Sequence, residues 1–129
     1  MKDHVDSELV PTASGRTSQP TADCPVEVAL AAISGRWATL VLRDLMHGPR
    51  SFSELRAGLP RLSAKVLTER LDSLVAQGVV RCDRSPGFPV RTSYELTPKG
   101  TLLRPLLVQL YRTGEALLGE RAEVRRGSA

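Results

Sequence analysis

The chain of 129 residues has room for one domain, and its 41% hydrophobic residues can build a packed core, which excludes a wholly disordered protein. Only 4% of the residues are aromatic, so Leu, Val and Ala must form most of that core. The formal net charge of +4 comes from the middle of the chain, where residues 36–91 hold ten Lys and Arg against five Asp and Glu. This basic region favours a polyanionic partner, although an ordinary arginine-rich surface has the same composition.

Several classes of protein are excluded by what the sequence lacks. No apolar run approaches the roughly 20 residues of a membrane span, and no apolar stretch follows Lys2, so neither a membrane segment nor a secretory signal is expected. Cys24 and Cys82 do not make a disulfide framework and fit a reducing cytoplasm. With His4 and His47 they show no metal-ligand spacing, and there is no glycine-rich phosphate loop. We expect a cytoplasmic protein that is not an enzyme and has no metal or cofactor.

The N-terminal half predicts a disordered tail followed by helices. Residues 1–23 are rich in Ser, Thr, Pro and Gly and cannot bury enough surface to offset chain entropy. Asp23 is the predicted N-cap of the first helix, and Ser63 is the predicted N-cap of the fourth. The helical spacing of apolar residues predicts helices over residues 24–33, 36–47, 53–58 and 64–77. A short strand is expected at residues 50–52, after the Gly48-Pro49 helix stop.

The C-terminal half predicts a hairpin and a leucine-rich helix. Strands are expected over residues 79–84 and 91–96, joined by a loop rich in Pro and Gly. A last helix should run from Pro98 to Leu118, kinked by Pro105, and leave residues 119–129 as a frayed tail. A helix pair followed by a β-hairpin predicts a mainly α protein with a small β-sheet, a winged helix-turn-helix over residues 24–118.

The fourth predicted helix carries the candidate reading surface. Leu67, Leu71, Leu74 and Val75 share one of its faces. The opposite side of its first two turns presents polar and small side chains, namely Ser63, Lys65, Val66, Thr68, Glu69 and Arg70. Such side chains can contact base edges and phosphates in a major groove, and a helix N-terminus favours a phosphate. The alternative is that these residues form an ordinary solvated helix face, which has the same composition.

The elements that follow add two further interpretations. Arg84 and Arg91 bracket the hairpin loop, and a basic hairpin beside a reading helix can lie over the DNA backbone or enter the minor groove. A rigid surface loop with incidental arginines is the alternative. The leucines of the last helix either seal a dimer or close the core of one chain, which periodicity does not separate.

Several segments together resemble the HxlR family of bacterial winged-helix regulators. They are Cys24–Glu27, Ser34–Trp37, Gly48–Leu55, Leu62–Leu71 and Pro89–Pro98, with Gly100, within a resemblance that covers residues 23–118. The resemblance implies a homodimer formed by the N- and C-terminal helices. Each subunit would place residues 63–77 in a major groove of a pseudo-palindromic operator. Val90 and Ser93 depart from the family's common residues, and the N-terminal tail lies outside its pattern.

The resemblance also implies a role for Cys24. Some family members sense quinones, aldehydes or oxidants through a cysteine just before the first helix, and a thiol at a helix N-terminus gains thiolate character. A structural cysteine in the dimer interface is the alternative. Cys82 is interpreted as a small apolar strand residue.

The expected function is a sequence-specific DNA-binding transcriptional regulator, a repressor controlled by a thiol-reactive or small-molecule signal. The alternative is a winged helix that contacts another protein and does not bind DNA. The basic bias of the reading helix and hairpin favours the first, because a protein-binding winged helix has no need of it.

Overall fold

The computed structural model describes residues 21–127, which divide into two compact units, one ending at Ser34 and the other beginning at Gly35. Of the predicted tail, only residues 21–23 are among those described. The first unit holds α1 (Pro25–Ile33), with Pro25 in the first turn, where its missing N–H costs nothing. Cys24 is the N-cap residue of α1, so the prediction of Asp23 is wrong, because the chain is still extended at Cys24.

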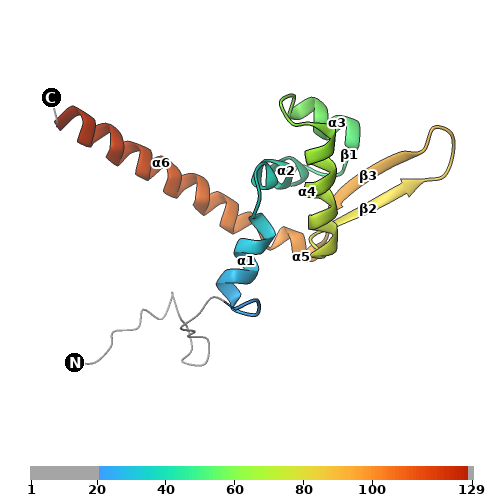
Figure 1. Ribbon diagram of the computed structural model, residues 1–129, viewed down its shortest axis with the longest axis horizontal. Coiled ribbons are helices and arrows are strands. Elements are labelled where there is room, and N and C mark those ends of the chain that lie inside the picture. The colour runs from blue at the N-terminus through green and yellow to red at the C-terminus, as the bar shows by residue number, and fades with distance from the viewer. Residues whose placement is uncertain (1–20, 128–129) are drawn as a thin grey trace. The chain divides into compact units, whose positions relative to one another are not determined.

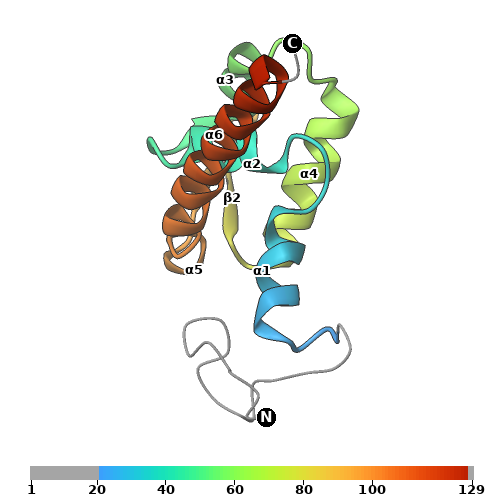
Figure 2. The ribbon, with the colours of Figure 1, turned by 90° about the vertical axis from the view of Figure 1, so that its left-hand side faces the viewer.

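The second unit contains the predicted helix pair and hairpin (Figure 1). A three-stranded antiparallel sheet of order β1-β3-β2 accompanies the helices, and α2 lies between α4 and α6 in both views (Figures 1 and 2). The elements are α2 (Ala38–Leu45), β1 (Arg50–Ser51), α3 (Phe52–Gly58), α4 (Ala64–Ala76), β2 (Val80–Ser85), β3 (Arg91–Leu96), α5 (Pro98–Thr101) and α6 (Arg104–Gly127). This order confirms the predicted mainly α winged helix-turn-helix.

Caps set the starts of the two helices of the helix-turn-helix. The Ser51 Oγ accepts from the Glu54 N–H at 3.1 Å, while the Ser51 N–H donates to the Glu54 carboxylate at 2.9 Å and lowers the pKa of that carboxyl. This capping box draws Phe52 into α3, one residue before its predicted start. Ser63 caps α4 as predicted, its Oγ accepting from the Val66 N–H at 3.1 Å.

The core of this unit is aliphatic, as the composition requires. The least exposed large side chains are Val41, Leu42, Leu45, Leu55, Leu62, Leu67, Leu71, Leu74 and Val80. On α4 the predicted inner face is confirmed for its three leucines and wrong for Val75, which lies at the edge of that face and is 38% exposed. Leu59 and Leu62 are buried in the turn between α3 and α4, so this turn is itself part of the core.

The hairpin is joined to the end of α4 by a close backbone approach. The Thr97 Oγ1 donates to the Gly78 carbonyl at 2.6 Å, and the Thr97 N–H donates to the Val79 carbonyl at 3.1 Å. A Cβ on Gly100 would lie 2.0 Å from the Val79 carbonyl oxygen, so no larger residue fits there. Thr97 also accepts from the Gly100 N–H at 3.1 Å and thereby caps α5.

The predicted boundaries of the second helix and of the last helix are wrong. The leucine-rich segment forms two helices, α5 and α6, rather than one kinked helix, because Pro105 lacks an N–H and its ring opposes the carbonyl four residues earlier. Pro105 instead lies in the first turn of α6, and α6 continues to Gly127 instead of ending at Leu118. The start of α2 is delayed from Arg36 to Ala38, because Trp37 takes a left-handed backbone conformation with φ 78°.

Replacing Gly100 by Ala should destabilise the fold. The added Cβ meets backbone that cannot move without parting α4 from the hairpin, so we expect Gly100→Ala to lower the free energy of unfolding by about 1–3 kcal/mol. Urea denaturation measures this. Gly119→Ala is the control, because a Cβ there meets nothing within 4 Å and should raise helix stability by up to about 1 kcal/mol. Equal stability of Gly100→Ala and wild type would contradict the close approach.

Candidate nucleic-acid interface

The first two turns of α4 present most of the predicted reading residues to solvent. Lys65, Thr68 and Glu69 are exposed, and Val66 and Arg70 are half-buried. The Ser63 side chain is exposed, but its oxygen already serves as the α4 cap. The surface that α4 offers to a partner therefore centres on Lys65, Thr68 and Glu69.

The Thr68 hydroxyl can still accept a hydrogen bond from a partner. Its hydroxyl donates to the Ala64 carbonyl at 2.8 Å, one turn back along α4. The oxygen lone pairs remain, so Thr68 can accept a hydrogen bond from a base amino group. Glu69 is likewise an acceptor, whereas Lys65 supplies the donors and the positive charge.

Arg70 differs from its neighbours because it binds the protein's own backbone. Its Nε donates to the Arg36 carbonyl at 2.9 Å, and its guanidinium lies over Gly35, where a Cβ would be 2.7 Å from Cζ. Both residues beside Arg36 have positive φ, 93° at Gly35 and 78° at Trp37. A bulky residue in that conformation needs support from its surroundings, and the Arg70 bond supplies it at the start of α2.

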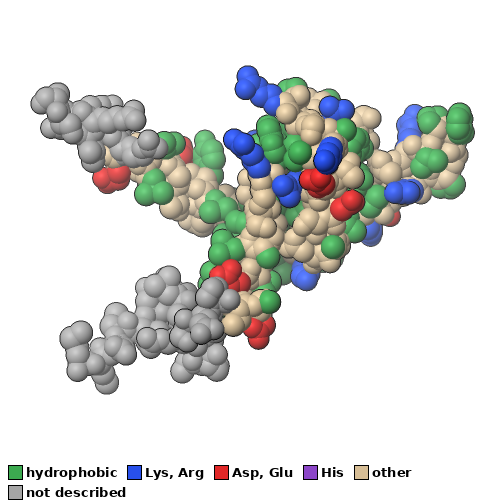
Figure 3. Space-filling view, viewed as in Figure 1, with side chains coloured by type: hydrophobic (Ala, Val, Ile, Leu, Met, Phe, Trp, Pro, Cys, Tyr) green, Lys and Arg blue, Asp and Glu red, His purple; other side chains and the backbone are tan. Residues whose placement is uncertain are grey.

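The arginines of the hairpin divide into two groups. Arg81 is held by carboxylates, pairing with Glu95 across the ladder and with Asp83 at 3.3 Å. Arg84 and Arg91 are exposed, and among the described side chains neither forms an ion pair. Figure 3 shows Lys and Arg side chains projecting from the helices and from the hairpin on this face.

The two cysteines lie in different surroundings. Cys24 is half-buried at the N-terminus of α1, and Cys82 lies opposite Tyr94 in the β2–β3 ladder. Burial raises the pKa of the Tyr94 hydroxyl, and its hydrogen bond with Cys82 raises it further. Cys82 is therefore part of the packing of the sheet. Within residues 21–127 no three His, Cys, Asp or Glu side chains gather as metal ligands would.

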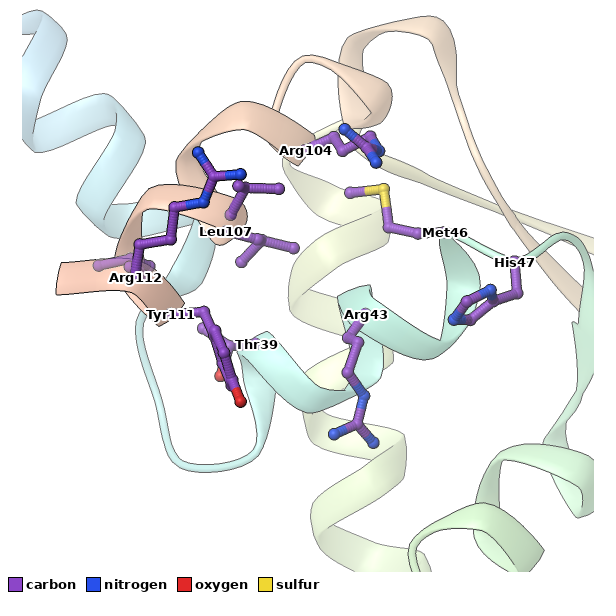
Figure 4. A pocket seen from close by; sticks show the side chains of 10 residues that line it. Thr39, Arg43, Met46, His47, Arg104, Leu107, Tyr111 and Arg112 are labelled. Atoms are coloured by element: carbon purple, nitrogen blue, oxygen red, sulfur yellow. The ribbon is translucent and has the colours of Figure 1, made fainter. Parts of the chain in front are cut away.

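A hollow of about 540 Å³, which the sequence did not predict, lies between α2 and the start of α6 (Figure 4). Met46 and Leu107 give it apolar walls, while Arg43 and Arg104 add positive charge; Arg43 is paired with Asp44 at 3.0 Å. The other lining residues are Thr39, His47, Val108, Leu110, Tyr111 and Arg112. Its volume lies within the roughly 300–1,000 Å³ of small-molecule sites. Periodicity could not reveal it, because its two walls come from helices far apart in the chain.

No single helix in the described range is both long and apolar enough to cross a membrane; α1 and α2 reach that length and composition only when counted together across the break between them.

The helix-turn-helix with its capped, outward-facing α4 and the hairpin beside it define a winged-helix transcriptional regulator. The chain belongs to the HxlR-like helix-turn-helix family, whose model matches residues 32–122. The HTH-type transcriptional regulator YvaP of Bacillus subtilis is 46% identical over 88 residues, covering 67% of this chain and 82% of YvaP.

Two solved structures have the same fold. The redox regulator HypR in its reduced form is 32% identical with a TM-score of 0.67, covering 71% of this chain and 91% of HypR. The reduced form of the transcriptional regulator YodB from Bacillus subtilis is 34% identical with a TM-score of 0.62, covering 69% of this chain and 88% of YodB.

Removal of the Arg70 side chain should loosen the start of α2. We expect Arg70→Ala to lower the free energy of unfolding by about 1 kcal/mol, because the Arg36 carbonyl loses its donor at a partly exposed site. Trp37 is the one tryptophan of the chain, so its fluorescence emission should shift as well. Arg61→Ala, at an exposed residue of the turn before α4, is the control. Unaltered emission and stability in Arg70→Ala would show that the bond does not support Trp37.

Proposed function

We propose that this protein is a sequence-specific DNA-binding transcriptional regulator that acts in the cytoplasm, with α4 in the major groove. One observation carries the proposal. The buried leucines of α4 turn Lys65, Thr68 and Glu69 outward over its first two turns, where the helix N-terminus also favours a phosphate. The exposed Arg84 and Arg91 of the hairpin add charge that no described carboxylate neutralises. The other predicted contacts, Ser63, Val66 and Arg70, belong to the same proposed surface.

We further propose that the protein binds as a homodimer through its terminal helices. Several large apolar side chains of α6 are exposed, namely Leu110, Tyr111, Leu117 and Leu118, at 43–71%. On α1, Val26, Val28 and Leu30 are exposed by 50–59%. Apolar side chains in such number on two helices favour a second copy as their cover. Two copies related by a twofold axis would read a pseudo-palindromic operator.

For the signal, we propose that a thiol-reactive compound modifies Cys24 and relieves repression. Cys24 is half-buried at the start of α1, where the helix dipole favours the thiolate. HypR, a relative in structure, is described as a redox regulator, which supports a signal of this kind. A small molecule bound in the hollow between α2 and α6 is the second candidate signal, favoured by the volume of that hollow.

Binding to duplex DNA tests the central proposal. The duplex that the wild-type chain retains from fragments of its own genome serves as the operator, and sedimentation of the complex should give two chains per duplex. We expect Lys65→Ala to weaken binding by about 1–3 kcal/mol, to a degree that depends on the operator sequence. Arg56→Ala, at an exposed residue of α3 outside the proposed contacts, is the matched loss of one charge and should bind as wild type does. If the wild-type chain retains no duplex even at low salt, the DNA-binding proposal is wrong. A winged helix that contacts another protein is then the remaining interpretation.

Substitution of Cys24 separates the two candidate signals. We expect Cys24→Ser to keep operator binding, because serine is close to cysteine in size and is favoured at the N-cap position that Cys24 occupies, and to lose release from DNA by thiol-reactive electrophiles. Cys82→Ser should respond as wild type does. Release measured by fluorescence anisotropy of labelled operator is the readout. A Cys24→Ser variant that still releases DNA would exclude Cys24 as the sensor and would favour a ligand bound in the hollow.

A further inference from the structure

Helices α2 and α6 each present one face to the hollow between them (Figure 4). On α6, Arg104, Leu107 and Tyr111 follow one another at intervals of three and four residues, which places them on the same side of a helix. On the α2 side, Thr39 and Met46 are two helical turns apart. The hollow is therefore a groove with two helical walls, and both walls belong to the second compact unit.

The lining of this groove is largely apolar and partly open to water. Met46, Leu107 and Val108 are half-buried, and Tyr111 is 71% exposed. Water is released when an apolar body covers such side chains, and that release favours binding. The groove therefore suits a ligand with a hydrophobic part.

The charged groups around the groove have one sign. Arg43, Arg104 and Arg112 line it, and none of the described lining residues is Asp or Glu. Arg43 is paired with Asp44 at 3.0 Å, whereas neither Arg104 nor Arg112 forms an ion pair with a described side chain. These two cations lie next to apolar surface without a counter-charge, and an anionic ligand would supply one.

We propose that the groove binds an organic acid with a hydrophobic body, its carboxylate on the guanidinium of Arg104 and its body along Met46, Leu107 and Tyr111. A guanidinium binds a carboxylate through two parallel N–H···O bonds, which are stronger than bonds between neutral groups. Arg104 shares the α6 face of Leu107 and Tyr111, so one ligand can reach the charge and the apolar wall together. The inference rests on the proposed function only where it makes this acid the signal, because binding of the acid requires no DNA.

Octanoate is the probe, and octanol and octylammonium have the same chain length with a neutral and a cationic head group. The sequence contains two methionines, Met1 and Met46, so NMR of the methionine methyl groups reports on the groove through one signal, which Met46→Leu identifies. We expect octanoate to shift the Met46 signal saturably. Octanol and octylammonium should bind at least about tenfold more weakly, because they lose the charge-assisted bonds to arginine.

Variants of the lining residues separate the two parts of the site. We expect Arg104→Ala to weaken octanoate binding about tenfold, and Arg104→Lys to restore a part of it, because lysine keeps the charge without the paired donors. Tyr111→Ala should weaken octanoate and octanol by the same factor, since it removes apolar contact. Arg61→Ala, an exposed arginine that does not line the groove, is the matched loss of one charge and should bind octanoate as wild type does.

A Met46 signal that millimolar octanoate leaves in place overturns the proposal. Equal affinity for the three head groups overturns it too, because the arginines would then select nothing, and so does unchanged octanoate binding by Arg104→Ala. A Met46 shift that follows the concentration of protein instead of octanoate would show that the second copy proposed above covers the groove. All these titrations are made without DNA, so their failure leaves operator binding by α4 standing, and a failure of operator binding leaves the octanoate result standing.

Discussion

The rotation of α4 about its own axis is set by the burial of Leu67, Leu71 and Leu74, and the candidate interface depends on it. Burying a leucine stabilises the fold by about 1.5–3 kcal/mol, and a rotation by one residue, about 100°, would bring all three toward water. The polar side that carries Lys65 and Glu69 is therefore held outward by the core behind it. The outward side of α4 therefore needs no structural element to orient it other than this core.

Polar contacts then set where α4 lies relative to its neighbours. Arg70 ties its middle to the start of α2 through the Arg36 carbonyl. At its end, Lys99 donates to the Gln77 carbonyl at 3.2 Å, and the Thr97 hydroxyl donates to the following carbonyl. Since Thr97 directly follows β3, the same bonds orient the hairpin relative to α4. Helix α4 and the hairpin are thus joined through the backbone around Gly100.

This arrangement separates arginines that look equivalent in the sequence. Arg70 flanks the polar side of α4 by its position on the helix, and its Nε is bound to a carbonyl 34 positions earlier. Arg81 is neutralised by two carboxylates, whereas Arg84, three residues on, has none among the described residues. Helical or strand periodicity states the direction of a side chain and not which distant group meets it, so these assignments required coordinates.

The sequence by itself determined the order of the helices and strands as far as β3, the cap at Ser63 and the leucine face of α4, because each follows from local propensity and a period of 3.6 or 2. Tertiary structure decided the left-handed Trp37, the engagement of Arg70 and the hollow between α2 and α6. Each of these depends on contacts, or on their absence, between segments far apart in the chain, and no local pattern encodes the packing of one such segment on another.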